Sequence, residues 1–188
     1  MSIKETFLSL YREHVSRPGA EELLEWLQKT DFFTAPASTR FHLACDEGLA
    51  THSVNVFCYM RDHFFDPDTD SMESFALCGL LHDLCKANFY KRSQRNVKND
   101  KGQWEQQPYF SIEDQFPYGH GEKSVYLIER FVRLKPAEAM AVRWHMGGFD
   151  DTAKSGGYTI SNAFERYPLA VKLHLADVAS TYLVEGGK

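Results

Sequence analysis

The sequence predicts an all-α domain that carries one inserted β-hairpin. Most of the chain has apolar residues at the three- and four-residue spacing of amphipathic helices, and clusters of Pro, Gly and Asp interrupt this pattern. Residues 91–118 differ, because they are polar and aromatic and contain the turn-forming run Asp100-Lys101-Gly102. With 188 residues the chain can bury roughly 70% of its unfolded surface, so it needs no disulfide to fold. We therefore expect residues 1–188 to form a single helical domain with an insertion at 91–118.

Before the insertion, each expected helix has an apolar stripe and a breaking signal after it. These helices cover residues 3–15, 21–30, 48–65 and 74–86, with a loop at 31–40. Pro18-Gly19 separates the first two helices, and Asp66-Pro67-Asp68 ends the third. Ser71 is placed to cap the fourth helix.

The insertion and the segments after it complete the expected order of elements. Residues 95–99 and 103–110 flank the turn and are predicted to pair as a hairpin. Helices are then expected at 121–134 and 137–145, on either side of Lys135-Pro136. Glycines at 147–148 and 156–157 bracket a flexible loop, and a last helix runs from about residue 161 to 184 with a kink before Pro168.

Charge and cysteine usage exclude some classes of protein. The formal net charge is −5, which does not favour nucleic-acid binding by the whole surface. The four cysteines, at positions 45, 58, 78 and 85, form no C-x-x-C pair, so we expect free thiols in a reducing compartment. No signal peptide and no run of 18 apolar residues is found, so we expect a cytoplasmic protein without a membrane partner.

Six side chains able to bind metal follow one another along the chain. They are His52, His82, Asp83, His120, His145 and Asp177. Imidazole and carboxylate together suit Mn, Fe, Ni, Co or Zn, and Mg is a further candidate. Six ligands are more than one tetrahedral ion needs. The sequence therefore predicts one or two divalent metal ions, and two neighbouring ions account best for the number of ligands.

The spacing of these residues resembles a known family. The run from Leu80 to Lys86, which contains His82-Asp83, resembles the HDxGK signature of HD-domain metal-dependent phosphohydrolases. The segment from Gly48 to Ser53 resembles their GLxxHS segment, and Asp177 matches their last ligand. The landmarks span residues 48–177. Two positions depart from the family pattern, because Cys85 and Glu47 stand where the family usually has Gly. The resemblance implies an HD-domain helical bundle with the metal site among its central helices.

The resemblance also implies roles for these residues. His52, His82, Asp83 and Asp177 would be the first ligands, and Asp83 could bridge two ions and orient the attacking hydroxide. The remaining pair, His120 and His145, would bind a second metal as in dinuclear members, or else contact the substrate phosphate. Lys86 would meet the scissile phosphate, so Asp83 and Lys86 are the expected catalytic residues.

A basic and aromatic stretch follows the central motif. Residues 86–101 hold six cations and one acid, with aromatic residues interspersed and following. This composition fits phosphate steering and base stacking, and it equally fits a solvated loop. The expected substrate-binding residues, including one histidine near the first ligand segment, are Lys86, Lys91, Arg92, His42 and Tyr90.

The predicted function is a metal-dependent phosphohydrolase that acts on a nucleotide, a cyclic nucleotide or a short oligonucleotide through a metal-activated water. The expected partner is a small phosphorylated substrate, and short single-stranded nucleic acid also fits. Two alternatives stay open: a mixed-valence di-iron oxygenase of the same superfamily, and a non-catalytic nucleotide-binding module. The oligomeric state is open too, and a dimer is compatible with the aromatic content.

Overall fold

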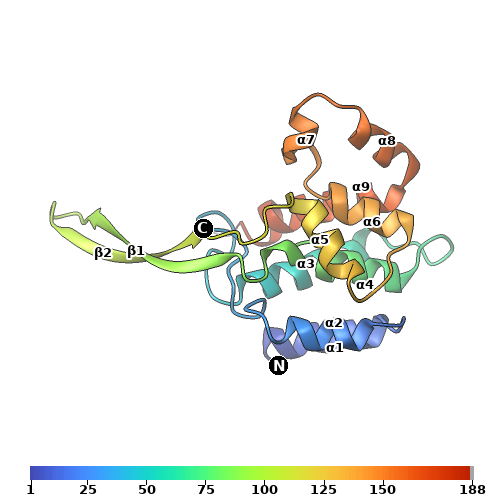
Figure 1. Cartoon of the computed structure of the whole chain (residues 1–188), viewed down its shortest axis with the longest axis horizontal. Helices are drawn as coiled ribbons and strands as arrows, with labels where there is room; N and C mark the ends of the chain where they lie inside the picture. Colours follow the sequence, from blue (N-terminus) through green and yellow to red (C-terminus); the bar gives the residue numbers. More distant parts are fainter. Residues whose placement is uncertain (187–188) are drawn as a thin grey trace.

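A computed structural model describes residues 1–186 and is mostly helical, with one small antiparallel sheet (Figure 1). The all-α prediction is confirmed at this level. The elements are α1 (Ile3–His14), α2 (Ala20–Leu27), α3 (Gly48–Phe64), α4 (Met72–Leu81), β1 (Tyr90–Lys98), β2 (Trp104–Ile112), α5 (His120–Glu129), α6 (Pro136–Trp144), α7 (Asp151–Lys154), α8 (Thr159–Arg166) and α9 (Pro168–Ala179).

The centre of the helical body is α4. Its sequence from Ser74 to Leu81 is buried at every position, which is typical of a helix surrounded by other helices. It packs against α1, α3, α6 and α9, and these helices share one apolar core. The site residue His82 directly follows α4, so it is held at the end of the most buried helix in the molecule.

Two glycines allow helices to approach closely beside the predicted site. A Cβ atom added at Gly79 in α4 would lie 2.7 Å from the Cα of Phe57 in α3. A Cβ atom added at Gly121 in α5 would lie 2.1 Å from the carbonyl oxygen of Arg143 in α6. Each close approach therefore brings together two helices that contain or directly precede predicted metal ligands, α3 with α4 and α5 with α6.

The prediction of one helix over residues 74–86 is wrong at its C-terminal end. The helix α4 stops at Leu81, and residues Leu84–Lys86 form a separate 3₁₀ turn. Asp83 lies between them with φ −98° and ψ 21°, outside the α-helical region. The apolar pattern continues through Leu84, which is why it did not reveal this break. Likewise, α5 ends at Glu129 rather than at 134.

The segment after α6 contains more regular structure than expected. The predicted flexible loop includes a 3₁₀ turn at Gly147–Phe149 and the short helix α7, whose N-terminus is capped by the carboxylate of Asp150. The last helix is divided at Pro168 into α8 and α9, at the expected position. After α9 the chain continues as a π-helical segment, Ser180–Val184.

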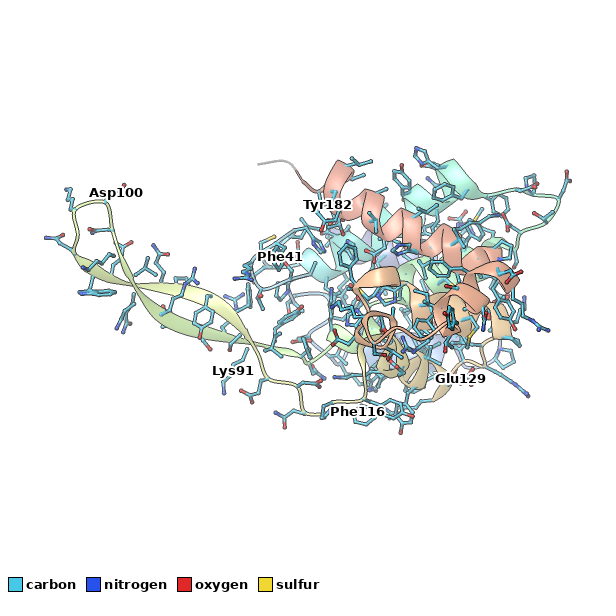
Figure 2. All side chains as sticks on the ribbon, turned by 90° about the horizontal axis from the view of Figure 1, so that it is seen from above. Phe41, Lys91, Asp100, Phe116, Glu129 and Tyr182 are labelled. Carbon is cyan, nitrogen blue, oxygen red and sulfur yellow. The ribbon has the colours of Figure 1, made fainter. Side chains whose placement is uncertain are left out.

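The predicted hairpin is confirmed and forms an arm. Strands β1 and β2 pair from Tyr90 opposite Ile112 to Lys98 opposite Trp104, so β1 begins five residues before the expected start. The arm extends away from the helical body in both views (Figures 1 and 2). Figure 2 shows Asp100 at its tip and Lys91 near its base. Across the described residues, no helix is long and apolar enough to cross a membrane, and all four cysteines are free thiols.

Candidate metal centre

The four predicted histidine ligands come together as two pairs. The Nε2 atoms of His52 in α3 and His82 after α4 lie 3.3 Å apart. The Nε2 atoms of His120 in α5 and His145 after α6 lie 3.1 Å apart. Two nitrogens on one ion, each about 2.0–2.1 Å from it, are about 2.9–3.4 Å apart in octahedral or tetrahedral geometry. Both pairs therefore have the spacing of two nitrogens that share an ion.

Asp83 lies between the two pairs and offers one carboxylate oxygen to each. Its Oδ1 is 2.9 Å from Nε2 of His120 and 3.5 Å from Nε2 of His145. Its Oδ2 is 3.8 Å from Nε2 of His52 and 3.6 Å from Nε2 of His82. A carboxylate placed in this way could contact two cations, one through each oxygen, and its placement follows from the position of Asp83 in the break after α4.

Asp177 completes the first pair. It lies on α9, and its Oδ1 is 3.1 Å from Nε2 of His52. Although burial disfavours its charge, the contact with His52 holds the pKa of Asp177 below its ordinary value. Two donor sets result. One is made of His52, His82 and Asp177 together with Oδ2 of Asp83, and the other of His120, His145 and Oδ1 of Asp83.

The other ring nitrogen of each histidine is also occupied, which fixes the rings. Nδ1 of His82 lies 2.9 Å from the carbonyl oxygen of Gly79, and Nδ1 of His145 lies 2.7 Å from that of Val142. A carbonyl oxygen only accepts, so each Nδ1 donates and each Nε2 is left as the atom free to bind a cation. Such orienting contacts accompany most metal-bound histidines.

Two orienting residues were not predicted from the sequence. Glu185 places its carboxylate oxygens 3.0 and 3.1 Å from Nδ1 of His52, and Asn55 donates to the same carboxylate at 2.9 Å. The Sγ atom of Cys85 lies 3.3 Å from Nδ1 of His120. In the sequence, Cys85 is distinguished only by replacing the glycine of the HD-type pattern. Glu185 had no local signal, because it follows the last helix in an ordinary polar terminus.

The π-helical segment explains how Glu185 reaches the site. On a regular helix, residues eight apart point about 80° away from each other around the axis. The wider turn, closed by the hydrogen bond from the Glu185 amide to the Ser180 carbonyl at 2.9 Å, brings Glu185 back to the face of Asp177. The two carboxylates therefore contact the same imidazole from both of its nitrogens.

The raised pKa values of two histidines show that the cluster binds protons when no metal is present. Burial opposes protonation of His52, but the contact with Asp177 raises its pKa to about 9. Burial likewise opposes protonation of His120, while Cys85 and Asp83 raise its pKa to about 10. Without metal, these two imidazoles hold protons at neutral pH, one within each donor set. Cations at the same places would compete with those protons.

Lys86 and Tyr90 lie in the wall of a pocket above the donors. The pocket has a volume of about 750 Å³ and is lined by groups that include His42, Asp83 and Glu185. Lys86 donates to Oδ2 of Asp83 at 2.6 Å and to the Ala37 carbonyl at 2.8 Å. Burial disfavours its charge, but Asp83 raises the pKa of Lys86, so it is an ammonium.

His42 also faces this pocket. Its side chain is 15% exposed, and its ring centre lies 4.8 Å from that of His52. Both of its ring nitrogens are buried without a hydrogen-bond partner among the described residues. Buried polar atoms without partners are rare in folded proteins, so these nitrogens are available to a ligand in the pocket.

The remaining two predicted substrate-binding residues lie outside the pocket, at the base of the arm. Lys91 is exposed and pairs with Glu113 at 2.9 Å. Arg92 is exposed and pairs with Asp46 of the helical body. The structure thus brings His42, Lys86 and Tyr90 to the pocket and leaves these two cations on the arm.

A second hollow, of about 820 Å³, lies beside Arg17, Glu73 and residues 133–136. Arg17 and Glu73 in its lining are already paired, since Arg17 contacts Glu73 at 3.0 Å and Glu138 at 2.8 Å. The two hollows are similar in volume, but among the described residues the metal donors converge at the pocket above Asp83 and not at the second hollow.

No protein-family model, curated protein or solved structure matches this chain. The chemistry of the candidate centre is therefore interpreted from its own donors, spacing and burial.

Proposed function

We propose that this protein is an HD-type metal-dependent phosphohydrolase, located in the cytoplasm, that cleaves the phosphoester of a nucleotide or short oligonucleotide. The observation that carries the proposal is the convergence of two imidazole pairs on the two oxygens of Asp83. A second support is Lys86, which reaches the same carboxylate from the pocket wall. A site that binds cations beside a fixed ammonium is suited to a phosphate group.

The two donor sets fit divalent metal ions, which when bound would supply Lewis acidity and lower the pKa of water. Asp83 would hold both halves of the centre at a fixed separation. Lys86 uses two of its three N–H groups to donate hydrogen bonds to Asp83 and to the Ala37 carbonyl. The third is left to donate to a phosphoryl oxygen, where charge increases during hydrolysis. Neither ring nitrogen of His42 has a hydrogen-bond partner within residues 1–186, so both can contact the same group.

The pocket has the size and rim expected for one nucleotide. Its volume of about 750 Å³ lies within the roughly 300–1,000 Å³ of small-molecule sites. Four exposed apolar or aromatic side chains stand around it, and they are Phe41, Ile112, Phe149 and Tyr182. Figure 2 shows Phe41 and Tyr182 on the side of the body from which the arm extends. Aromatic rings at the mouth of a phosphate site can stack on a base.

A hydrolysis screen tests the proposal. Nucleotides, cyclic nucleotides and short single-stranded oligonucleotides are incubated with Mn, Ni, Co, Mg or Fe(II), comparing wild type with Asp83→Ala. The surface variant Asp151→Ala is the matched control, because its carboxylate is 99% exposed. We expect hydrolysis by wild type and the control, and none by Asp83→Ala.

Full activity of Asp83→Ala would contradict the proposed role of Asp83. Inactivity of the wild type across the panel would contradict the proposed reaction. Iron retained in that inactive protein, with an oxygen-dependent di-iron signal, would indicate the oxygenase. Tight nucleotide binding without turnover would indicate the binding module.

A further inference from the structure

The arm has two faces of different chemistry. Side chains alternate between the faces of a strand, so the register places even-numbered residues of both strands on one face. We name it the Trp104 face, and it consists of Tyr90, Arg92, Gln94, Asn96, Lys98, Trp104, Gln106, Pro108, Phe110 and Ile112. These ten described side chains include cations, amides and aromatic rings but no carboxylate. The opposite, Arg95 face contains Arg95, Tyr109 and the acid Glu105.

The Trp104 face is continuous with the pocket above the metal donors. At the base of the arm, the paired residues Tyr90 and Ile112 belong both to this face and to the pocket lining. At the far end, Trp104 is 68% exposed and lies opposite Lys98. Eight steps of an antiparallel strand separate the two ends, a length of about 27 Å. A linear ligand on this face would therefore have one end at the pocket.

Each end of the face combines a ring with a positive charge. Nζ of Lys98 lies 5.3 Å from the ring centre of Trp104, and the guanidinium of Arg92 lies 5.7 Å from that of Phe110. A nucleotide presents one π-surface and one phosphate, which match one ring and one cation. The side-chain amides of Gln94, Asn96 and Gln106 lie between these two groups and offer neutral hydrogen bonds.

The charge distribution favours a polyanion at the arm. Residues 90–112 contain five cations and two acids, so this segment carries +3. The whole chain carries −5, so the rest carries −8. A polyanion would be attracted to the arm and repelled by the rest of the molecule.

We propose that the Trp104 face binds single-stranded nucleic acid and leads the end of the strand to the pocket. The binding step stands on the arm alone, and what happens at the strand end rests on the phosphohydrolase function proposed above. A duplex is a poorer ligand because its base faces are stacked inside it. The length of about 27 Å suits a site in the lower part of the range of roughly 4–16 nucleotides known for single-strand grooves.

The test measures binding of fluorescent 12-mer DNA and RNA by anisotropy, with chelator present so that hydrolysis is not required. The variant Lys98→Ala/Trp104→Ala removes one ring and one cation from the Trp104 face. Its matched control, Arg95→Ala/Tyr109→Ala, removes one ring and one cation, 5.5 Å apart, from the Arg95 face. Arg92 is left unchanged because its contact with Asp46 connects the arm to the body.

We expect the 12-mer to bind the first variant at least about tenfold more weakly than wild type, because stacking and one phosphate contact are lost. The control should weaken binding about twofold, through its charge alone. The salt dependence of log affinity should become shallower by about 0.7 for the first variant. A 12-mer with abasic sites should bind wild type about tenfold more weakly than the normal 12-mer, and this comparison needs no variant to fold.

Equal weakening by both variants, equal binding of the abasic 12-mer, or no binding at low salt would overturn the proposal. Lys98→Ala/Trp104→Ala could also have a smaller mass in solution than wild type and an unchanged 12-mer affinity. That result would overturn the proposal, because it would indicate that a second copy of the chain covers this face. Binding without hydrolysis under any metal would leave the arm proposal standing and remove the proposed reaction. Hydrolysis of mononucleotides without 12-mer binding would remove the arm proposal and leave the proposed reaction standing.

Discussion

Replacing Glu185 by glutamine tests whether His52 is held in place as a metal ligand. The Glu185 carboxylate contacts Nδ1 of His52 at 3.0 and 3.1 Å and accepts from Asn55 at 2.9 Å. Glutamine has the same shape but no charge, and only its oxygen accepts. A charge-assisted hydrogen bond contributes about 1.5–3 kcal/mol and a neutral one about 0.5–1.5 kcal/mol. The expected loss is therefore about 1–1.5 kcal/mol.

That loss corresponds to roughly tenfold weaker metal binding, since about 1.4 kcal/mol is a factor of ten. The two donor sets predict that only the binding step that uses His52 is affected. Competition with a chromophoric chelator for Zn or Mn resolves the two steps. Glu165→Gln is the control, because that side chain is exposed and lies on α8, away from the donors. Binding by Glu185→Gln within twofold of wild type in both steps would refute the reasoning, as would an equal loss in Glu165→Gln.

Three further predictions concern stability and are measured by denaturant unfolding of the metal-free protein. Glu138→Gln should lose about 2–3 kcal/mol at pH 7, because the buried carboxylate pairs with Arg17. Burial alone would raise the pKa of Glu138, but Arg17 lowers it. The difference in unfolding free energy between wild type and Glu138→Gln should therefore shrink below about pH 4.5. A difference that does not change with pH would contradict this. Glu47→Gly should gain roughly 0.5–1 kcal/mol, since Glu47 adopts φ 62°, and a loss would contradict that estimate. Gly79→Ala should destabilise by about 1–3 kcal/mol through overpacking against Phe57, and unchanged stability would show that the helices can separate freely.

The predicted helices and hairpin depended on local signals that the fold preserves. Apolar spacing located the helices, and Asp100-Lys101-Gly102 located the turn of the arm, where Gly102 has φ 75°. Proline at 168 located the boundary between α8 and α9. Such signals act within a few residues, so tertiary contacts changed the ends of the elements more than their existence.

The misses arise from contacts between distant segments. The break at Asp83 allows its two oxygens to face the two histidine pairs, of which only His82 comes from the same segment, and nothing in the apolar pattern records it. Glu185 meets His52 across 133 residues of sequence. Cys85 meets His120 only because α5 packs beside the 3₁₀ turn. The six expected donors are predicted by residue type and order, whereas the residues that orient them depend on the folded geometry.

The most direct test of the central claim is the number of metal ions bound per chain, measured by elemental analysis after equilibrium dialysis against Mn or Zn. The two donor sets predict two ions for wild type and for the surface control Asp151→Ala, one ion for His120→Ala, and none or one weakly bound ion for Asp83→Asn. Two ions retained at full affinity by Asp83→Asn, or none bound by wild type, would contradict the claim that Asp83 joins two metal sites.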